Sequence, residues 1–256
     1  MNTDKSGLYI YCIVGTRQER NWRAIGIDRT DVLTISYDDL SMVVSSHPLT
    51  RVVINRDNMI AHQKVIERVM QEFDSVLPVR FGTIAASADE IRNLLDRRQR
   101  EFKTLLRHVE RRIELGVKGL WKNMTAIYAE IVRDNPAIEK AKKAAANQAG
   151  ATGLPARREV GRLVEKALLK KKEQEAKQIA DFFQKTVMDA KLSKTGTDEM
   201  FINASFLVDR GREKEFDNLM EQLVKRYKDR VLFKYAGPLP VFNFVNIVIN
   251  PEEWER

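Results

Sequence analysis

The chain has 256 residues, of which 43% are hydrophobic and 31% are charged, and its formal net charge is +8. These proportions are typical of a soluble globular protein and exclude an intrinsically disordered chain. No apolar run approaches the ~20 residues that cross a bilayer, and the first residues carry an acid where a secretory signal would be basic. We therefore expect a cytosolic protein with no membrane partner.

The apolar run from Leu8 to Val14 predicts the first strand. Both of its alternating sets of side chains are largely apolar, which is typical of a central strand buried on both faces. The run contains Cys12, the single cysteine of the chain. One cysteine excludes an internal disulfide and a zinc site built from several cysteines, so we expect Cys12 to be a small buried hydrophobic residue.

A hairpin and a helix are expected next. Residues 32–37 and 41–45 are strand-like and are separated by the polar turn Asp38-Asp39-Leu40. A helix follows over about residues 58–73, with Asp57 as its N-cap. Its apolar residues recur at three- and four-residue spacing and predict one face turned towards a core: Met59, Ile66, Val69, Met70 and Phe73.

The segment 75–84 is an apolar strand with Pro78 inside it and Arg80 near its end. Proline cannot donate to a ladder of hydrogen bonds, which makes this an uncommon piece of a sheet. An unpaired buried cation would be too costly to keep. We therefore expect Arg80 to be largely buried and paired with a carboxylate or with backbone carbonyls. The alternative is that Arg80 contacts a partner.

A long helix is predicted over about residues 88–112. Ser87 and Glu90 have the spacing of a capping box, and an apolar stripe follows them: Ile91, Leu94, Leu95, Phe102, Leu105, Leu106 and Val109.

The second half is expected to open with a strand through Trp121. Helices follow over about residues 134–194, interrupted near residues 150–155. A strand at 201–208, a helix at 216–227 and strands at 231–235 and 241–249 complete the chain. This order predicts an α+β protein, and a ferredoxin-like variant is the most economical arrangement. We expect two domains, residues 1–112 and residues 113–256, the second carrying the helical insertion at about 134–194.

The helical insertion contains most of the excess positive charge. Between Glu139 and Lys177 there are 11 Lys or Arg and 5 Asp or Glu residues, a net of +6. This stretch has no aromatic residue on which a single-stranded nucleic acid could stack its bases, although a phosphate role would need charge alone. The simplest interpretation is a solvated helical face, with six lysines as its core: Lys140, Lys142, Lys143, Lys170, Lys171 and Lys172.

Candidate sites are sparse, and we expect no catalytic, cofactor-binding or metal-binding residue. None of the three histidines lies three or four residues from another, which excludes a helical pair of metal ligands. His62 is expected to be a hydrogen-bonded packing residue, His47 a turn residue and His108 part of an exposed basic face. The pair Asp38 and Asp39 could help to bind a cation, but aspartate in turns explains it without a function.

Several motifs together resemble the gas vesicle GvpF/GvpL family along nearly the whole chain. In the first half these are Leu8-Tyr9-Ile10-Tyr11, residues 39–45, and His62-Gln63 leading to Leu77-Pro78-Val79-Arg80-Phe81-Gly82-Thr83. In the second half they are Glu114-Leu115-Gly116-Val117-Lys118 with Trp121, and residues 237–245.

The resemblance implies a non-enzymatic α+β protein whose C-terminal domain is ferredoxin-like with added helices. It would be a minor structural or assembly protein, cytoplasmic and associated with the gas vesicle shell, and would contribute to buoyancy. Its implied partners are the main gas vesicle shell protein and other minor vesicle proteins. Two alternatives remain open at this point: a nucleic-acid-binding module and a regulatory protein that binds a small molecule.

Overall fold

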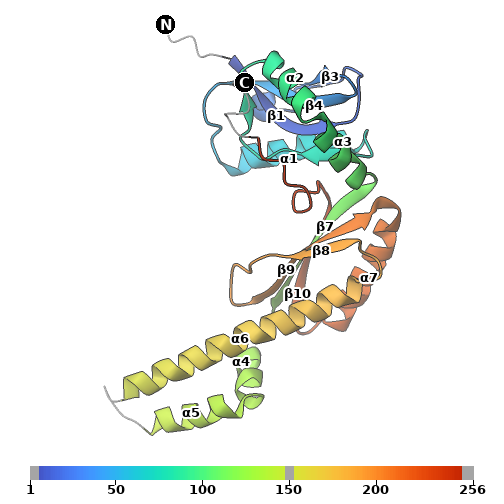
Figure 1. Cartoon of the computed structure of the whole chain (residues 1–256). Coiled ribbons are helices and arrows are strands. Elements are labelled where there is room, and N and C mark those ends of the chain that lie inside the picture. The colour runs from blue at the N-terminus through green and yellow to red at the C-terminus, as the bar shows by residue number, and fades with distance from the viewer. Residues whose placement is uncertain (1–5, 148–152, 250–256) are drawn as a thin grey trace. The chain divides into compact units, whose positions relative to one another are not determined.

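The computed structural model describes residues 6–147 and 153–249, and it mixes helices with antiparallel sheets (Figure 1). The α+β class is therefore confirmed. The chain divides into two compact units. Among the described residues, unit 1 comprises 6–114, 209–211 and 237–249, and unit 2 comprises the rest. The division after Glu114 lies close to the expected boundary, but residues 237–249 group with unit 1, whereas the linear division assigned them to the second domain.

Unit 1 is built on one sheet with the order β2-β3-β4-β1-β5, and β6 also pairs with β1. Its strands are β1 (Ser6–Val14), β2 (Asn21–Arg23), β3 (Val32–Tyr37), β4 (Leu40–Pro48), β5 (Val76–Pro78) and β6 (Ile84–Ala85). Residues 9–14 of β1 are fully buried, so the predicted central strand is confirmed. Tyr37 pairs with Leu40 across the predicted hairpin, and Asp38 and Asp39 form its turn.

The helices of unit 1 are η1 (Ile27–Arg29), α1 (Arg56–Met70), α2 (Ala88–Arg97) and α3 (Gln99–His108). The single helix predicted over 88–112 is wrong, because non-helical backbone angles at Arg98 separate α2 from α3. Ser87 caps α2 as predicted. The N-cap of α1 is Asn55, whose side chain accepts the backbone N–H of Asn58 at 2.7 Å, and Asp57 lies in the first turn instead.

Unit 2 contains a four-stranded sheet with the order β10-β7-β9-β8. Its strands and helices are β7 (Arg112–Trp121), α4 (Met124–Arg133), α5 (Pro136–Ala146), α6 (Leu154–Phe183), β8 (Asp189–Leu192), β9 (Met200–Asp209), α7 (Glu213–Arg226) and β10 (Val231–Leu239). The short helix η3 (Arg210–Arg212) lies between β9 and α7, where the chain passes from unit 1 to unit 2. This is a βαββαβ succession with three helices in its first crossover, which is the predicted ferredoxin-like variant with added helices. Its core stacks Phe183 of α6 on Phe216 of α7, beside Phe206 of β9.

Two predicted elements of the second half are wrong. Residues 189–192 form strand β8, which pairs with β9, so α6 ends at Phe183 rather than near residue 194. No strand is found over the described residues 241–249. Their alternating apolar side chains are buried at Val241, Val245 and Ile247, but the segment lacks a strand partner. Asn243 fixes it instead, because its backbone N–H donates to buried Glu114 at 2.9 Å.

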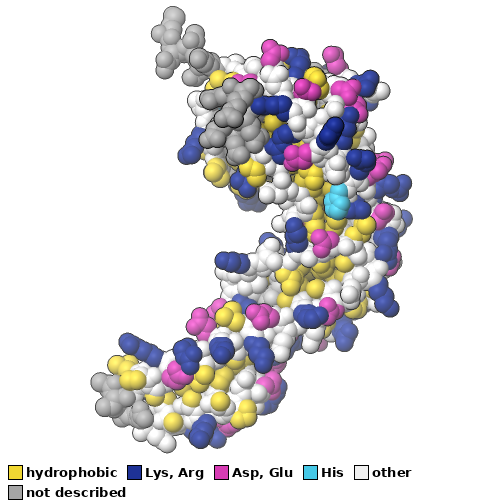
Figure 2. All heavy atoms as spheres, viewed as in Figure 1, with side chains coloured by type: hydrophobic (Ala, Val, Ile, Leu, Met, Phe, Trp, Pro, Cys, Tyr) yellow, Lys and Arg dark blue, Asp and Glu magenta, His cyan; other side chains and the backbone are white. Residues whose placement is uncertain are grey.

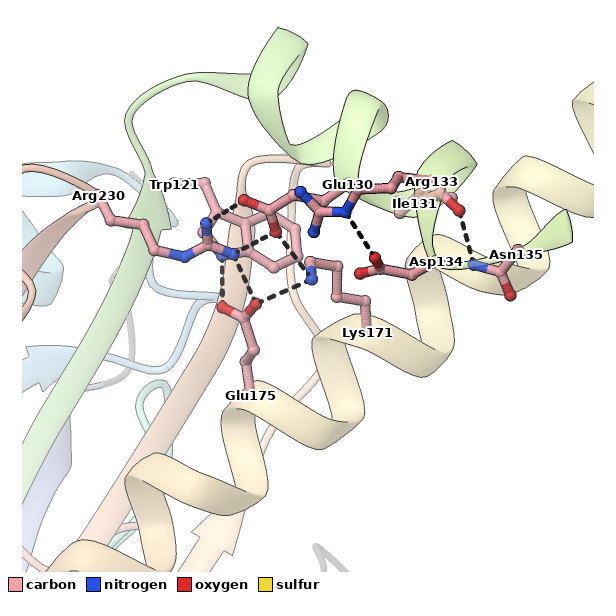
Figure 3. A network of polar contacts seen from close by, with 9 residues as sticks. All are labelled: Trp121, Glu130, Ile131, Arg133, Asp134, Asn135, Lys171, Glu175 and Arg230. Carbon is pink, nitrogen blue, oxygen red and sulfur yellow. Dashed lines mark hydrogen bonds and ion pairs between the residues drawn. The ribbon is translucent and has the colours of Figure 1, made fainter. Parts of the chain in front are cut away.

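An ion network joins the helices of unit 2 to its sheet (Figure 3). Arg230 contacts both carboxylate oxygens of Glu130 on α4, at 2.5 and 2.9 Å, and Glu175 on α6 at 2.8 Å. Lys171 lies 3.0 Å from Glu130 and 3.4 Å from Glu175. The indole N–H of Trp121 donates to Glu175 at 2.7 Å. These charges are mutually satisfied, so the network stabilises the base of the helical insertion.

Candidate binding groove

Unit 1 contains a groove of about 960 Å³. Three segments form it: residues 54–63 at the start of α1, residues 78–81 after β5, and residues 242–247. We call it the α1 groove. Its walls are mainly apolar, with Met59, Ile60, Phe81 and Phe242 among the lining side chains.

Several apolar side chains of the α1 groove lie open to solvent. The exposed fractions are 79% for Ile54, 52% for Met59, 39% for Ile60 and 40% for Phe242. The prediction that Met59 belongs to the core is therefore wrong. Helical spacing does place it with Ile66, but the buried face of α1 begins one turn later, at His62. Neighbouring exposed apolar residues of this kind mark a binding surface more often than isolated ones do.

The floor of the α1 groove is held by buried polar contacts. The hydroxyl of Tyr9 lies 2.7 Å from Nδ1 of His62, and Nε2 of His62 lies 3.2 Å from the carbonyl oxygen of Val79. A carbonyl can only accept, so Nε2 carries the proton and Nδ1 accepts from Tyr9. Burial lowers the pKa of His62 to about 4, which keeps the ring neutral. His62 is thus the hydrogen-bonded packing residue that the sequence predicts.

Backbone groups along this floor are also engaged inside unit 1. The N–H of Val79 donates to Tyr11 at 2.9 Å, and the N–H of Gly82 donates to the Tyr9 hydroxyl at 3.2 Å. Pro78 pairs with Cys12 at the edge of the sheet and has no N–H to offer. The floor therefore presents side chains, not free backbone donors, to anything that enters.

Arg80 is exposed, and the described residues give its side chain no ion pair or hydrogen bond. The expectation of a buried, paired guanidinium is wrong. Its physical reason is that β5 ends at Pro78, so Arg80 falls in the loop beyond the strand and not within the apolar ladder. Arg56, at the start of α1, is the second exposed arginine on the groove wall. Sequence reasoning missed it, because an arginine in a first helical turn has no distinctive signal.

The other predicted candidates lie outside the groove. Asp38 and Asp39 are held by cations, since Arg17 contacts Asp38 at 2.7 Å and Lys103 contacts Asp39 at 2.7 Å. Across the described residues no cluster of metal-ligating side chains is found. Cys12 is fully buried, and burial raises the pKa of its thiol, as expected for a packing residue.

His47 and His108 differ in their surroundings. The expectation that His47 is a turn residue is wrong, because it lies in strand β4 and pairs with Gly7 of β1. Its Nδ1 is 2.7 Å from the carbonyl oxygen of Pro48. His108 ends α3 and is exposed, as the sequence indicates.

The basic helical segment is less uniform than its sequence indicates. Lys172 is only 7% exposed and donates to the carbonyl of Thr197 at 2.8 Å, and burial lowers its pKa. Lys171 belongs to the ion network. Both are therefore structural, contrary to the predicted solvated face, whereas Lys140, Lys142 and Lys170 are exposed. Figure 2 shows Lys and Arg side chains along this part of unit 2, with acidic and apolar side chains between them.

Among residues 6–147 and 153–249, no helix combines the length and the apolar character of a membrane span.

Comparisons with known proteins agree along almost the whole chain. Gas vesicle protein F of Microcystis aeruginosa is 24% identical over 94% of this chain and 99% of its own length. Gas vesicle protein F1 of Halobacterium salinarum is 27% identical over 87% of this chain and 84% of its own length. The crystal structure of the gas vesicle protein GvpF from Anabaena sp. superimposes with a TM-score of 0.82 at 23% identity, covering 95% of this chain and all of that one.

A family model defines the relationship. The model described as gas vesicle synthesis protein GvpL/GvpF matches residues 7–246, which include both units and the three segments of the α1 groove up to Asn246. The chain belongs to the GvpL/GvpF family of gas vesicle synthesis proteins.

Proposed function

We propose that this chain is a minor structural and assembly protein of the gas vesicle, which binds the main shell protein during vesicle formation and thereby contributes to buoyancy. The α1 groove is its binding surface. Membership of the family supports a role in the vesicle. The observation that carries the proposal is the cluster of exposed apolar side chains on the groove wall, with Ile54 and Met59 more than half exposed.

A hydrophobic partner suits this surface for an energetic reason. Burial of apolar surface contributes roughly 25 cal/mol of favourable free energy per Å². The exposed apolar side chains of the groove would bury such surface when a hydrophobic partner binds. The proposed partner forms the vesicle shell. The chain would therefore act at the shell, together with other minor vesicle proteins.

Two other functions receive less support. The basic helical segment offers no aromatic residue for base stacking, and two of its six central lysines are engaged within unit 2. A small-molecule site of similar volume would present convergent polar groups to its ligand. In the α1 groove both ring nitrogens of His62 are already bonded to Tyr9 and Val79. We therefore propose neither nucleic-acid binding nor enzymatic activity.

The experiment is capture of the main shell protein by the tagged chain from vesicle-forming cells. Met59→Glu places a charge on the groove wall, and Leu169→Glu on α6 is the matched control, since the two side chains are 52% and 55% exposed. We expect Met59→Glu to lose most of the captured shell protein and the control to keep it. Equal capture by both variants would overturn the groove as the binding surface.

Vesicle yield supplies the second readout. Cells that carry Met59→Glu should form fewer vesicles and float less than cells with the Leu169→Glu control. Both variants should unfold at the temperature of the parent, because neither side chain belongs to a core.

A further inference from the structure

The α1 groove also restricts the kind of segment that it can receive, and this inference rests on the proposed function. We infer that the groove binds an amphipathic α-helix of about two turns, with acidic residues flanking its apolar stripe. Three independent properties of the groove lead to this occupant: its backbone, its size and its charge.

The backbone argues against an added strand. A peptide that extends a sheet needs a row of free N–H and C=O groups at the edge. Here β5 is the edge strand and contains Pro78, which has no N–H. The N–H groups of Val79 and Gly82 are already bonded within unit 1. Side chains are what the groove offers, and a helix binds through side chains.

The size fits a short helix. A helix is roughly 10 Å across and rises about 1.5 Å per residue, which amounts to roughly 120 Å³ per residue. A groove of about 960 Å³ therefore holds about two turns. Two turns present apolar residues at positions i, i+3 or i+4, and i+7, which would meet Met59, Ile60 and Phe242 on the groove wall.

The charge of the groove lining predicts acidic residues beside the apolar stripe of that helix. Arg56 and Arg80 both line the groove and are exposed, and among the described residues the lining includes no Asp or Glu. His62, the remaining titratable group of the lining, is neutral near pH 7 because its pKa is lowered to about 4. Two arginines without opposing acids favour a partner that brings carboxylates, since complementary charge sets orientation and specificity.

The test uses synthetic stapled peptides and the full chain. The probe is a fluorescein-labelled helix with leucines at i, i+4 and i+7 and two flanking glutamates. A second peptide has lysines in place of the glutamates, and a third carries a central proline that prevents a helix. We expect the glutamate helix to bind by fluorescence anisotropy, the lysine helix to bind about tenfold more weakly at low salt, and the proline peptide not to bind.

Charge reversal in the protein sharpens the assignment. Arg80→Glu and Arg56→Glu should each shift the preference towards the lysine helix, and the difference between the two helices should shrink as ionic strength rises. Arg100→Glu, on an exposed position of α3 outside the groove, is the control and should leave the preference unchanged. A preference that no reversal alters would overturn the acidic flanks.

Other occupants give different results. Stronger binding of the proline peptide than of the helices would assign the groove to an extended segment. A dimer of the chain that Met59→Glu dissociates would assign it to a second copy, and tenfold tighter peptide binding after removal of residues 250–256 would assign it to the chain's own C-terminus. If no helix binds while shell protein is still captured and is lost in Met59→Glu, the helix is refuted and the proposed function stands.

Discussion

The ion network of unit 2 and the α1 groove of unit 1 differ in how their charged residues are satisfied. In unit 2, Glu130, Lys171, Glu175 and Arg230 satisfy one another at the base of the helical insertion. In unit 1, the wall of the α1 groove leaves apolar side chains exposed, and the described residues give Arg80 no ion pair or hydrogen bond. Mutually satisfied charges indicate a structural role, whereas open apolar surface beside unpaired cations indicates a binding role. Changes in the network should therefore affect stability, and changes in the groove should affect binding.

The largest effect is expected from Arg230→Met. The substitution leaves Glu130 and Glu175 close together with Lys171 as their shared cation. Removal of one member of a buried ion pair costs about 3–5 kcal/mol, and partial exposure of Arg230 reduces this to about 2 kcal/mol of unfolding free energy. Urea denaturation of the parent and the variant measures this loss of unfolding free energy. Arg162→Met, which breaks an exposed pair with Glu159, should change nothing measurable, and equal effects of the two would refute a structural network.

A smaller effect is expected from acid. Arg230 and then Lys171 lower the pKa of Glu130 from 4.5 to about 2. A carboxylate whose pKa is lowered in the folded state stabilises it above its ordinary pKa, and this stability is lost as the pH falls from about 4.5 towards 2. Each unit of pKa shift corresponds to about 1.36 kcal/mol of unfolding free energy. Because solvent screens this partly exposed group, we expect a loss of about 1.5 kcal/mol in acid.

The measurement is the unfolding free energy of the parent and of Glu130→Gln between pH 6 and pH 2.5. The parent should be the more stable above pH 4.5, and the difference should narrow as the pH falls. A difference that stays constant over this range would show that Glu130 does not titrate with a lowered pKa.

The sequence predicts the architecture of this chain better than its surface. The central strand and the β3–β4 hairpin follow from hydrophobic periodicity and turn residues, which act locally, whereas strand β8 of the ferredoxin-like succession did not follow from them. Pro78 indicated an unusual piece of a sheet, and β5 lies at the sheet edge. Hydrophobic periodicity does not show, however, which turns of a helix the sheet covers. Met59 was assigned to the core for this reason.

The burial and pairing of charged residues are equally hard to predict from hydrophobic periodicity. Arg80 follows an apolar run, but its burial depended on whether the strand continued past Pro78. Lys171 and Lys172 are indistinguishable in sequence from Lys170, yet their partners Glu130 and Thr197 come from other segments. Pairing across such distances in sequence leaves no local pattern. The α1 groove was missed for this reason, since residues 242–247 join α1 only in the folded chain.

A third prediction separates the lysines of the helical insertion. Lys171→Gln should cost about 1 kcal/mol of unfolding free energy, because it removes a partly buried cation between two carboxylates. Changing Lys140, Lys142 and Lys170 together to Gln should leave both stability and shell-protein capture unchanged, since all three are exposed. Loss of capture in the triple variant would place a binding surface on unit 2.

The smallest effect on stability is expected from Arg80→Met. The side chain is exposed and has no partner among the described residues, so the melting temperature should not change. A drop of several degrees would restore the structural role that the sequence suggested for Arg80.

The most direct test of the account is hydrogen exchange of the full chain with and without the main shell protein. Binding through the α1 groove predicts slower exchange of backbone amides in residues 54–63 and 242–247, and unchanged exchange in α5 and α6. The same protection should be absent in Met59→Glu. Protection confined to α5 and α6, with the segments of the groove unaffected, would contradict the assignment of binding to unit 1.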